Sequence, residues 1–425
     1  MSEASVSAIR LPSIRGFWRG EDMARRMVYR LLGGLSGGSL VLHESGSSVR
    51  FGAETAAGMP HVEIRVRDPR AFQYVLTGGV VGAGEAYMLG YWTSPDLVAV
   101  IRLFSANMAA MDAMDANSSR LRQLLMWGFH KLNGNTRNGS RRNIGAHYDL
   151  GNDFFRLFLD EQMMYSAAVY PSPETSLEEA SLHKLDLLCQ QLELQPEDHL
   201  LEIGTGWGGL AIHAARHYGC RVTTTTISRE QYNHACERVA QAGLADRVEV
   251  LCQDYRELGG QYDKLVSVEM IEAVGHEFYS EYFRRCSALL RPGGKFAIQA
   301  ITMADQRYVQ ARDSVDFIKR YIFPGGCLPS LEVIARHVAR DTDMQIVNLR
   351  DITLDYARTL EHWRERFLAA REQVRGMGFD EVFLRMWEFY LCYCEGGFRE
   401  RIISTVQLTM AKPGYRFDEP GHRSK

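Results

Sequence analysis

The sequence predicts an α/β protein in which a doubly wound, Rossmann-like parallel sheet follows a smaller N-terminal α/β domain. Two observations lead to this fold class. An apolar stretch at 200–203 runs into a turn with three close glycines, Gly204, Gly206 and Gly209. Beyond this turn, expected strands alternate with expected helices. The alternation is typical of a parallel sheet with helices on both faces, which binds its ligand at the carboxyl ends of its strands.

Residues 1–115 are expected to form the smaller domain. A helical stretch over 23–32 precedes short strands at 40–42 and 49–51, with a turn at Ser45-Gly46 between them. The segment 62–66 alternates apolar and charged side chains, which is the pattern of a half-buried strand. This domain carries no evident catalytic constellation.

Residues 116–143 are predicted to be a basic linker. The stretch from Arg120 to Arg142 contains six arginines and lysines and no acidic residue. One interpretation is a solvated linker. The other is a contact with anionic lipid head groups, to which each basic residue contributes on the order of 1 kcal/mol. The net charge of the whole chain is −3, which argues against a polycation that binds nucleic acid.

Residues 144–425 are expected to form the catalytic domain. An amphipathic helix over 177–192 leads into the glycine turn. The segment 306–330 interrupts the alternation of strands and helices, and we interpret it as a lid or substrate loop. The segment 356–398 is predicted to be mostly helical. Strands are expected at 199–204, 221–227, 248–254, 263–269, 295–301, 345–350 and 402–411.

The residues around the glycine turn indicate which ligand it holds. The glycine spacing satisfies G-x-G-x-x-G, the motif that cradles dinucleotides in dehydrogenases. A dehydrogenase would place an acidic residue at the end of the second strand, but this chain has Ser228 and Gln231 there. It has instead Glu202 inside the first strand and Asp254 after the third. That pattern is typical of class I methyltransferases, so S-adenosylmethionine is the expected cofactor.

Composition sets the outer limits of the prediction. A chain of 425 residues with 46% hydrophobic residues can bury a large core in two or three domains. The most apolar run, 75–92, is interrupted by glycines and Glu85, so no membrane span is expected. The eight cysteines lack metal-ligand spacing, which argues against zinc and suits the reduced thiols of a cytoplasmic protein.

Several further motifs resemble one family. The segment 147–155, followed by Met164-Tyr165-Ser166, is similar to the signature that precedes the catalytic domain in cyclopropane-fatty-acyl-phospholipid synthases. Other blocks agree in order and spacing, and the match runs from about residue 40 to residue 412. These blocks lie at 268–275, 317–326, 356–363, Trp387-x-x-Tyr390 and Phe398-Arg399.

The resemblance implies a transfer of the methyl carbon of S-adenosylmethionine to the cis double bond of an unsaturated phospholipid acyl chain. A carbocation forms, and a base removes a proton so that a cyclopropane ring closes. In the family this base resembles a bound bicarbonate, which makes bicarbonate a candidate second ligand. The expected partner is a phospholipid membrane surface, contacted peripherally at its inner face, with the N-terminal domain associated with lipid. A homodimer is a candidate assembly, and no nucleic acid partner is expected.

The resemblance also assigns cofactor contacts. Two of these assignments have a second interpretation. Ser228 and Gln231 have the spacing of a helix capping box, and Trp207 could equally be a packing residue. The matched residues are Gly204, Thr205, Gly206 and Trp207 in the first loop, Tyr165 and Ser166 over the methionyl part, Thr226, Ser228 and Gln231 on the ribose side, and Asp254 with Tyr255 at the adenine.

The base site is matched in part. Glu272 corresponds to the carboxylate that holds bicarbonate, Ile301 to its neighbour and Tyr356 to the phenol that completes the pocket. Glu272 beside Glu269 could alternatively be a structural pair.

Two positions depart from the family pattern. Ala167 stands where many members have cysteine, and Gln299 stands where they have histidine. Ala167 leaves its backbone N–H available, and a Gln amide can donate a hydrogen bond to an anion. Cys394 matches a C-terminal cysteine of the family, although a buried cysteine also serves as a small apolar residue.

The expected function is therefore that of a cyclopropane-fatty-acid synthase-like methyltransferase. One alternative is a lipid C-methyltransferase, in which loss of a proton from a neighbouring carbon leaves a methyl-branched unsaturated chain. The departures at Ala167 and Gln299 keep this alternative open. A small-molecule methyltransferase and a non-catalytic lipid-binding protein are the remaining alternatives.

Overall fold

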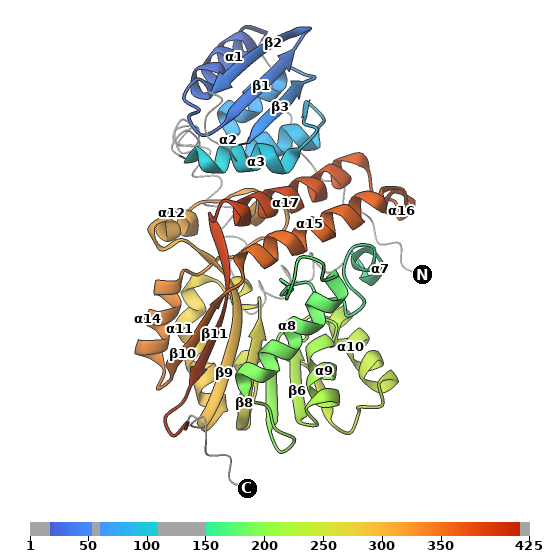
Figure 1. Cartoon of the computed structure of the whole chain (residues 1–425), viewed down its shortest axis with the longest axis vertical. Helices are drawn as coiled ribbons and strands as arrows, with labels where there is room; N and C mark the ends of the chain where they lie inside the picture. Colours follow the sequence, from blue (N-terminus) through green and yellow to red (C-terminus); the bar gives the residue numbers. More distant parts are fainter. Residues whose placement is uncertain (1–17, 53–59, 109–149, 417–425) are drawn as a thin grey trace. The chain divides into compact units, whose positions relative to one another are not determined.

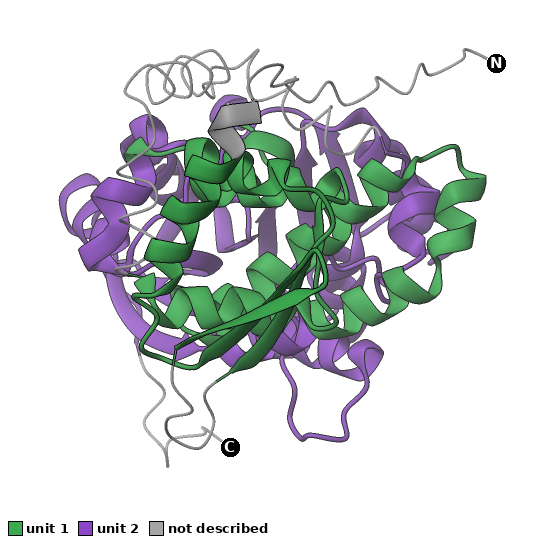
Figure 2. Cartoon of the chain, turned by 90° about the horizontal axis from the view of Figure 1, so that it is seen from above, with its two compact units in different colours: residues 1–132, 313–324, 360–402 green, residues 133–312, 325–359, 403–425 purple. Residues whose placement is uncertain are grey.

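The computed structural model describes residues 18–52, 60–108 and 150–416 (Figure 1). The chain forms two compact units, which are coloured separately in Figure 2. The predicted domain boundaries at 115 and 143 and the basic linker lie outside the described residues, and they stay predictions. The first unit comprises residues 1–132, 313–324 and 360–402, and the second comprises 133–312, 325–359 and 403–425.

The first unit contains a four-stranded sheet of order β2-β1-β3-β4. β1 and β2 form a hairpin, and β3 pairs parallel to β1. Ser45 and Gly46 connect the hairpin with φ of 49° and 79°, and two positive φ angles are what a type I′ turn requires. The strands are β1 (Ser39–Glu44), β2 (Ser47–Gly52), β3 (His61–Val66) and β4 (Trp92–Thr93).

Glycines allow the helices of the first unit to pack closely. A Cβ atom on Gly84 would lie 2.5 Å from the ring of Phe317, and one on Gly396 would lie 2.6 Å from Cγ2 of Ile101. The glycines that interrupt the apolar run 75–92 therefore include a helix contact point. No helix of the described residues is long and apolar enough to cross a membrane. The helices that lie wholly in this unit are α1 (Trp18–Leu32), α2 (Arg70–Met88), α3 (Leu97–Ala106), α13 (Phe317–Tyr321), α16 (Arg371–Gly376) and α17 (Glu381–Arg399).

The second unit contains a seven-stranded sheet of order β10-β11-β9-β8-β5-β6-β7. All seven strands expected from the sequence are present, and the predicted fold class is confirmed. The strands are β5 (His199–Ile203), β6 (Arg221–Thr226), β7 (Val248–Cys252), β8 (Tyr262–Val268), β9 (Leu290–Met303), β10 (Gln345–Asp351) and β11 (Ile403–Ala411).

One strand departs from the predicted parallel sheet. β11 pairs antiparallel to both β9 and β10. The chain leaves β10 at Asp351, which pairs with Val406 near the start of β11. The chain therefore returns at the same edge of the sheet after the intervening helices, and β11 must run in the opposite direction.

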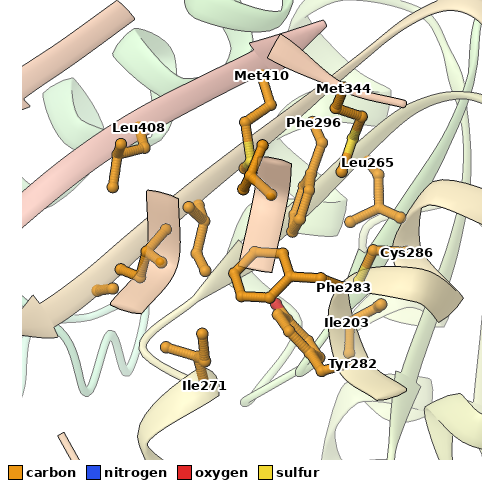
Figure 3. Packing of buried hydrophobic residues seen from close by; sticks show 14 of the residues in the cluster. Ile203, Leu265, Ile271, Tyr282, Phe283, Cys286, Phe296, Met344, Leu408 and Met410 are labelled. Atoms are coloured by element: carbon orange, nitrogen blue, oxygen red, sulfur yellow. The ribbon is translucent and has the colours of Figure 1, made fainter. Parts of the chain in front are cut away.

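Two helical layers cover the sheet of the second unit (Figure 1). Leu201 and Ile203 of β5 belong to the apolar core under α11 and α14, whereas Leu200 belongs to the core under α8, α9 and α10. This alternation results from the two-residue period of a strand. Figure 3 shows the first core, in which Phe283 and Cys286 of α11 lie with Phe296 and Met410 of the sheet.

The remaining helices lie mostly in the second unit. The predicted lid at 306–330 is divided between the units, because residues 313–324 belong to the first; its motion stays a prediction. The helices are α7 (Asn152–Arg156), α8 (Leu177–Leu192), α9 (Gly209–His217), α10 (Arg229–Gln241), α11 (Tyr279–Leu289), α12 (Tyr308–Asp313), α14 (Leu331–Asp341) and α15 (Thr353–Ala369), the last of which continues into the first unit.

Candidate active site

The glycine turn connects β5 to α9 at the carboxyl edge of the sheet. Gly204, Gly206 and Gly208 have φ of 103°, 52° and 87°, a region that glycine adopts without strain. A Cβ atom on Gly206 would meet nothing within 4 Å. The turn therefore presents bare backbone to open space next to a helix N-terminus, which is the arrangement that can hold a polar ligand.

Glu202 lies in β5, just before this turn. Its Oε2 accepts a hydrogen bond of 2.6 Å from the hydroxyl of Thr224, which is also hydrogen-bonded over 2.8 Å to the hydroxyl of Thr205. The side chain of Glu202 is deeply buried, and this burial raises its pKa to about 8. Burial therefore favours the neutral form of Glu202, whose carboxyl group fixes the hydroxyl of Thr224 beside the turn.

Trp207 and Tyr165 belong to one aromatic cluster. Trp207 is buried, and its Nε1 donates to Oδ1 of Asn152 over 2.7 Å. Its ring centroid lies 5.2 Å from that of Phe155, which lies 5.3 Å from Tyr165. The indole has the surroundings of a packing residue, and its contact with the cofactor stays a prediction.

Thr226, Ser228 and Gln231 form a buried polar group at the end of β6. Ser228 caps α10, because its Oγ accepts from the N–H of Gln231 over 3.3 Å. The side chain of Gln231 does not complete a capping box. Its Oε1 accepts from Thr226 over 2.8 Å, and the same threonine oxygen accepts from the N–H of Ser228 over 3.1 Å. Ser228 therefore has a structural role as a helix cap, and ribose binding by these three residues stays a prediction.

Asp254 and Tyr255 come directly after β7. The carboxylate of Asp254 accepts from Nε and Nη2 of Arg256 over 2.9 and 2.6 Å. The ring of Tyr255 packs edge-on against Tyr282 with centroids 5.5 Å apart. Both residues lie at the carboxyl edge where the adenine is expected, and Asp254 is held there by an ion pair.

Glu269 is the residue on which the expected catalytic side chains converge. It comes directly after β8 with a φ of 48°, a conformation that costs energy for a residue with a side chain. Its Oε1 accepts from the backbone N–H of Ala167 and from Nε2 of Gln299, each over 2.8 Å. Its Oε2 accepts from the hydroxyl of Tyr356 over 2.8 Å. The sequence alone suggested Glu269 only as a structural partner of Glu272.

A chain of three side-chain amides fixes the orientation of Gln299. The Oε1 of Gln299 accepts from Nε2 of Gln407 over 3.0 Å, and Oε1 of Gln407 accepts from Nε2 of Gln191 over 2.8 Å. Gln299 and Gln407 are inaccessible to solvent. Because the carbonyl oxygen of Gln299 is occupied by Gln407, its amide N–H group faces Glu269.

Glu272 lies beside Glu269 in a different environment. Its Oε1 accepts from the N–H of Ile301 over 2.5 Å, while its Oε2 is buried without a hydrogen-bond partner among the described residues. Burial, and then the charge of Glu269, raise the pKa of Glu272 to about 8. Burial also raises the pKa of Glu269, but three donors oppose this rise. Protonation is therefore favoured at Glu272, and the donors around Glu269 favour its ionised form.

Lys184 was missed by the sequence analysis. It lies on α8, is inaccessible to solvent, and its Nζ donates to the hydroxyl of Ser166 over 2.8 Å. Burial lowers the pKa of Lys184 to about 8, against the opposing effect of Glu269, Asp160 and Glu202. One signal was available: Lys184 shares the buried face of the helix with Ala180 and Leu188, where a lysine is unusual.

Cys394 lies apart from this group in the division of the chain. Glu272, Gln299, Ile301 and Tyr356 belong to the second unit, whereas Cys394 belongs to α17 of the first. Burial raises the pKa of its thiol well above the usual value, so the thiol stays protonated. These surroundings suit a small apolar residue, and a catalytic role for Cys394 stays a prediction.

The described residues contain no cluster of side chains that could hold a metal ion.

The sheet order, the glycine turn and the acidic residues at its edge define a class I methyltransferase, an enzyme that uses S-adenosylmethionine. Comparison with known proteins identifies its family. The chain belongs to the mycolic acid cyclopropane synthetase family, whose model matches residues 135–408. It is 43% identical to the tuberculostearic acid methyltransferase UfaA1 of Mycobacterium tuberculosis over 79% of this chain and 80% of the relative. It is 36% identical to the cyclopropane-fatty-acyl-phospholipid synthase of Escherichia coli, over 84% and 89% respectively.

Solved structures agree with this assignment. The cyclopropane synthase MmaA2 of M. tuberculosis has a TM-score of 0.60 and 31% identity, over 64% of this chain and 98% of its own. The mycolic acid cyclopropane synthase CmaA1, solved with SAH and CTAB, gives the same values. Coclaurine N-methyltransferase has a TM-score of 0.60 at 20% identity, which shows the fold alone. The predicted family, fold and enzyme class are confirmed: the chain is an S-adenosylmethionine-dependent methyltransferase that transfers a one-carbon group to lipid.

Proposed function

We propose that this enzyme transfers the methyl carbon of S-adenosylmethionine to the cis double bond of an unsaturated phospholipid acyl chain and releases a cyclopropane fatty acyl product. An alkene is a weak nucleophile without a proton to lose, so the enzyme needs no base before the transfer. It needs one afterwards, because the carbocation becomes neutral only when a proton leaves. A base beside the cofactor, shielded from water, is therefore the feature that this chemistry requires.

The environment of Glu269 is the observation that carries this proposal. The carboxylate accepts hydrogen bonds from Ala167, Gln299 and Tyr356. The next residue, Met270, lies against the cofactor turn, with its Cγ 3.4 Å from the position of a Cβ on Gly204. A fixed anion beside the turn can stabilise a carbocation and accept its proton.

The cofactor is held by the chain's own backbone in this proposal. S-adenosylmethionine, when bound, supplies an electrophilic methyl group on a positively charged sulfur. The turn presents the open backbone of Gly206, whereas the N–H groups of Gly204 and Thr205 already donate to the carbonyl of Thr225 over 3.0 and 3.1 Å. Ser166 is fixed by Lys184 at the expected methionyl end. We propose contacts with the cofactor for Gly204, Gly206, Ser166, Thr205, Trp207, Tyr165, Thr226, Ser228, Gln231, Asp254 and Tyr255.

A lipid C-methyltransferase is the second candidate function. It would form the same carbocation and differ in which carbon loses the proton. Two observations favour this candidate. Gln299 faces Glu269 with an amide, which cannot relay a proton as an imidazole can. The relative from M. tuberculosis with 43% identity is described as a tuberculostearic acid methyltransferase. Both functions require the same base, and the product distinguishes them.

Bicarbonate does not fit the residues present. Of the groups expected to surround it, the N–H of Ala167, Gln299 and Tyr356 all donate to the carboxylate of Glu269. The N–H of Ile301 donates to Glu272. We therefore route no step of the proposed reaction through bicarbonate.

We propose that the enzyme binds its lipid at an anionic membrane surface, from the cytoplasmic side, as a peripheral protein. The basic residues between Arg120 and Arg142 support this proposal through their charge. We further propose that the enzyme assembles as a homodimer.

The test is to incubate the purified enzyme with S-adenosylmethionine and liposomes of cis-unsaturated phospholipid and to analyse the lipids by mass spectrometry and NMR. A mass gain of one methylene with loss of the alkene signal is expected. The same gain with an alkene retained would replace the proposal by the C-methyltransferase function. No gain would contradict the lipid substrate.

A further inference from the structure

We infer that the carboxylate of Glu269 is a built-in replacement for a dissociable anion, so that the proton of the carbocation is accepted by the protein itself. This inference rests on the proposed function for the identity of the proton donor. It concerns the reacting base and predicts an enzyme whose turnover is independent of dissolved bicarbonate.

The hydrogen bonds of Glu269 support this inference. A carboxylate and a bicarbonate ion present a similar planar pair of oxygens. The pair in Glu269 is satisfied by a backbone amide, a side-chain amide and a phenol, at 2.8 Å each. No donor of this set is left over for a separate anion. Binding a second anion there would also place two negative charges side by side, which is unfavourable away from water.

The backbone of Glu269 gives a second, independent argument. Its φ of 48° lies in the left-handed region, where a glutamate is less stable than a glycine. This strained conformation leads the chain from β8 toward η2 (Ile271–Ala273) and places the carboxylate within hydrogen-bond distance of Ala167. A charged residue at a strained position is typical of a functional site.

The proton transfer balances without another reactant. A C–C bond forms between the methyl carbon and one alkene carbon while the C–S bond breaks, and its electron pair goes to sulfur. The other alkene carbon becomes the cation. A proton then passes from the added methyl group to Glu269, and the electrons of that C–H bond close the ring. Glu272 accepts from one backbone N–H, whereas Glu269 accepts from three donors, so Glu269 is the better stabilised anion of the two.

Glu269→Gly is the variant that tests the inference. Glycine suits the φ of 48°, so the variant is expected to fold, and removal of the side chain frees the three donors together with the volume of a small anion. Glu269→Gln is the matched control, because it keeps the shape of the side chain, removes its charge and leaves no room for an anion. Circular dichroism and calorimetric binding of S-adenosylhomocysteine establish that both variants are folded.

Turnover is measured in buffer freed of carbon dioxide, and again with added bicarbonate or formate. The wild-type rate is expected to be the same in each buffer. Glu269→Gly is expected to lose about 100-fold or more in turnover and to regain part of it with either anion, whereas Glu269→Gln regains none. A wild-type enzyme that needs bicarbonate would overturn the inference.

A second measurement tests the inference even if no lipid product forms, so that it can fail separately from the proposed function. Bicarbonate or formate is expected to raise the melting temperature of Glu269→Gly and to leave those of the wild type and Glu269→Gln unchanged, because an anion stabilises only a protein that binds it. Stabilisation of the wild type, or of no variant, would contradict the assignment of Glu269 to the anion position.

Discussion

The hydroxyl of Tyr356 donates a hydrogen bond of 2.8 Å to Oε2 of Glu269, and it thereby connects the first turn of α15 to the end of β8. The second oxygen of Glu269 is bound by Ala167 and Gln299. The phenol is thus the donor to Oε2, the oxygen that Ala167 and Gln299 do not bind, and it fixes the orientation of the carboxylate.

Tyr356→Phe is expected to lower turnover about 10- to 100-fold and to leave the affinity for S-adenosylhomocysteine unchanged. Loss of a hydrogen bond to a charged group costs about 1.5–3 kcal/mol, and the loss here falls on the base rather than on the cofactor turn. Steady-state kinetics and calorimetry measure the two quantities. Tyr415→Phe is the matched control, because it removes a 2.8 Å hydrogen bond to Glu193 at the surface. Equal losses in both variants would contradict a specific role of Tyr356.

Glu272→Gln is expected to change how stability depends on pH. The pKa of Glu272 rises from 4.5 to about 8 on folding, so the folded state retains a proton that the unfolded state loses. The contribution of Glu272 to the free energy of unfolding therefore decreases as the pH rises from 4.5 to about 8. The variant lacks this contribution. The melting temperature of the variant should therefore rise relative to that of the wild type as the pH increases across this interval. A difference in melting temperature that does not change with pH would refute the raised pKa of Glu272.

Lys184→Met is expected to move the acidic limb of the pH–rate profile to higher pH. The ammonium of Lys184 lowers the pKa of Glu269, and without it the base stays protonated to a higher pH. The profile of kcat/KM, compared with that of the wild type, measures the shift. Lys412→Met serves as the control, because Lys412 pairs with Asp343 outside the catalytic group. An unshifted profile would show that Lys184 acts only through packing or through Ser166.

Gly396→Ala is expected to destabilise the protein by about 1–3 kcal/mol. The new methyl group would lie 2.6 Å from Cγ2 of Ile101 on α3, so α17 and α3 must move apart. Thermal unfolding measures the loss. At Gly376, which ends α16, a Cβ would meet nothing within 4 Å, and Gly376→Ala should leave the melting temperature unchanged or raise it slightly. A similar loss in both variants would argue against close packing at Gly396.

Binding to vesicles that contain anionic phospholipid is expected to weaken when salt is added. The proposed contact uses the arginines and lysines between Arg120 and Arg142, and salt screens exposed charges over about 10 Å at 0.1 M. Cosedimentation with anionic and with neutral vesicles measures the effect. Binding that is unaffected by salt would indicate apolar insertion.

The sequence was sufficient to predict the strands of the second unit because each contains apolar or β-branched residues and is followed or preceded by a turn or a helical pattern. It was not sufficient to predict the direction of β11, since an apolar run has the same pattern in either direction. That direction depends on where the chain re-enters the sheet after helices α15 to α17, which is at the edge where β10 ends. The interleaving of the two units was missed for the same reason: aromatic residues after Asp380 show that α17 (Glu381–Arg399) is buried, without showing against which partner.

The candidate site divides in a similar way. Gly204 and Gly206 could be found because their role is local, in a turn directly after a strand. The role of Glu269 depends on Ala167, Gln299 and Tyr356, which are distant in the chain and converge only through the sheet and α15. A carboxylate next to another carboxylate gives no sign of which one is ionised. That distinction comes from the number of donors around each.

The order of segments in the first unit has a consequence for synthesis on the ribosome. Helices α2 and α3 are made early, but α17, which packs against both, ends at Arg399. Apolar side chains such as Ile101, which lies against Gly396 of α17, therefore stay uncovered in the nascent chain until nearly the whole polypeptide has emerged. A chaperone that shields these helices during translation should raise the yield of active enzyme more than one that acts after release.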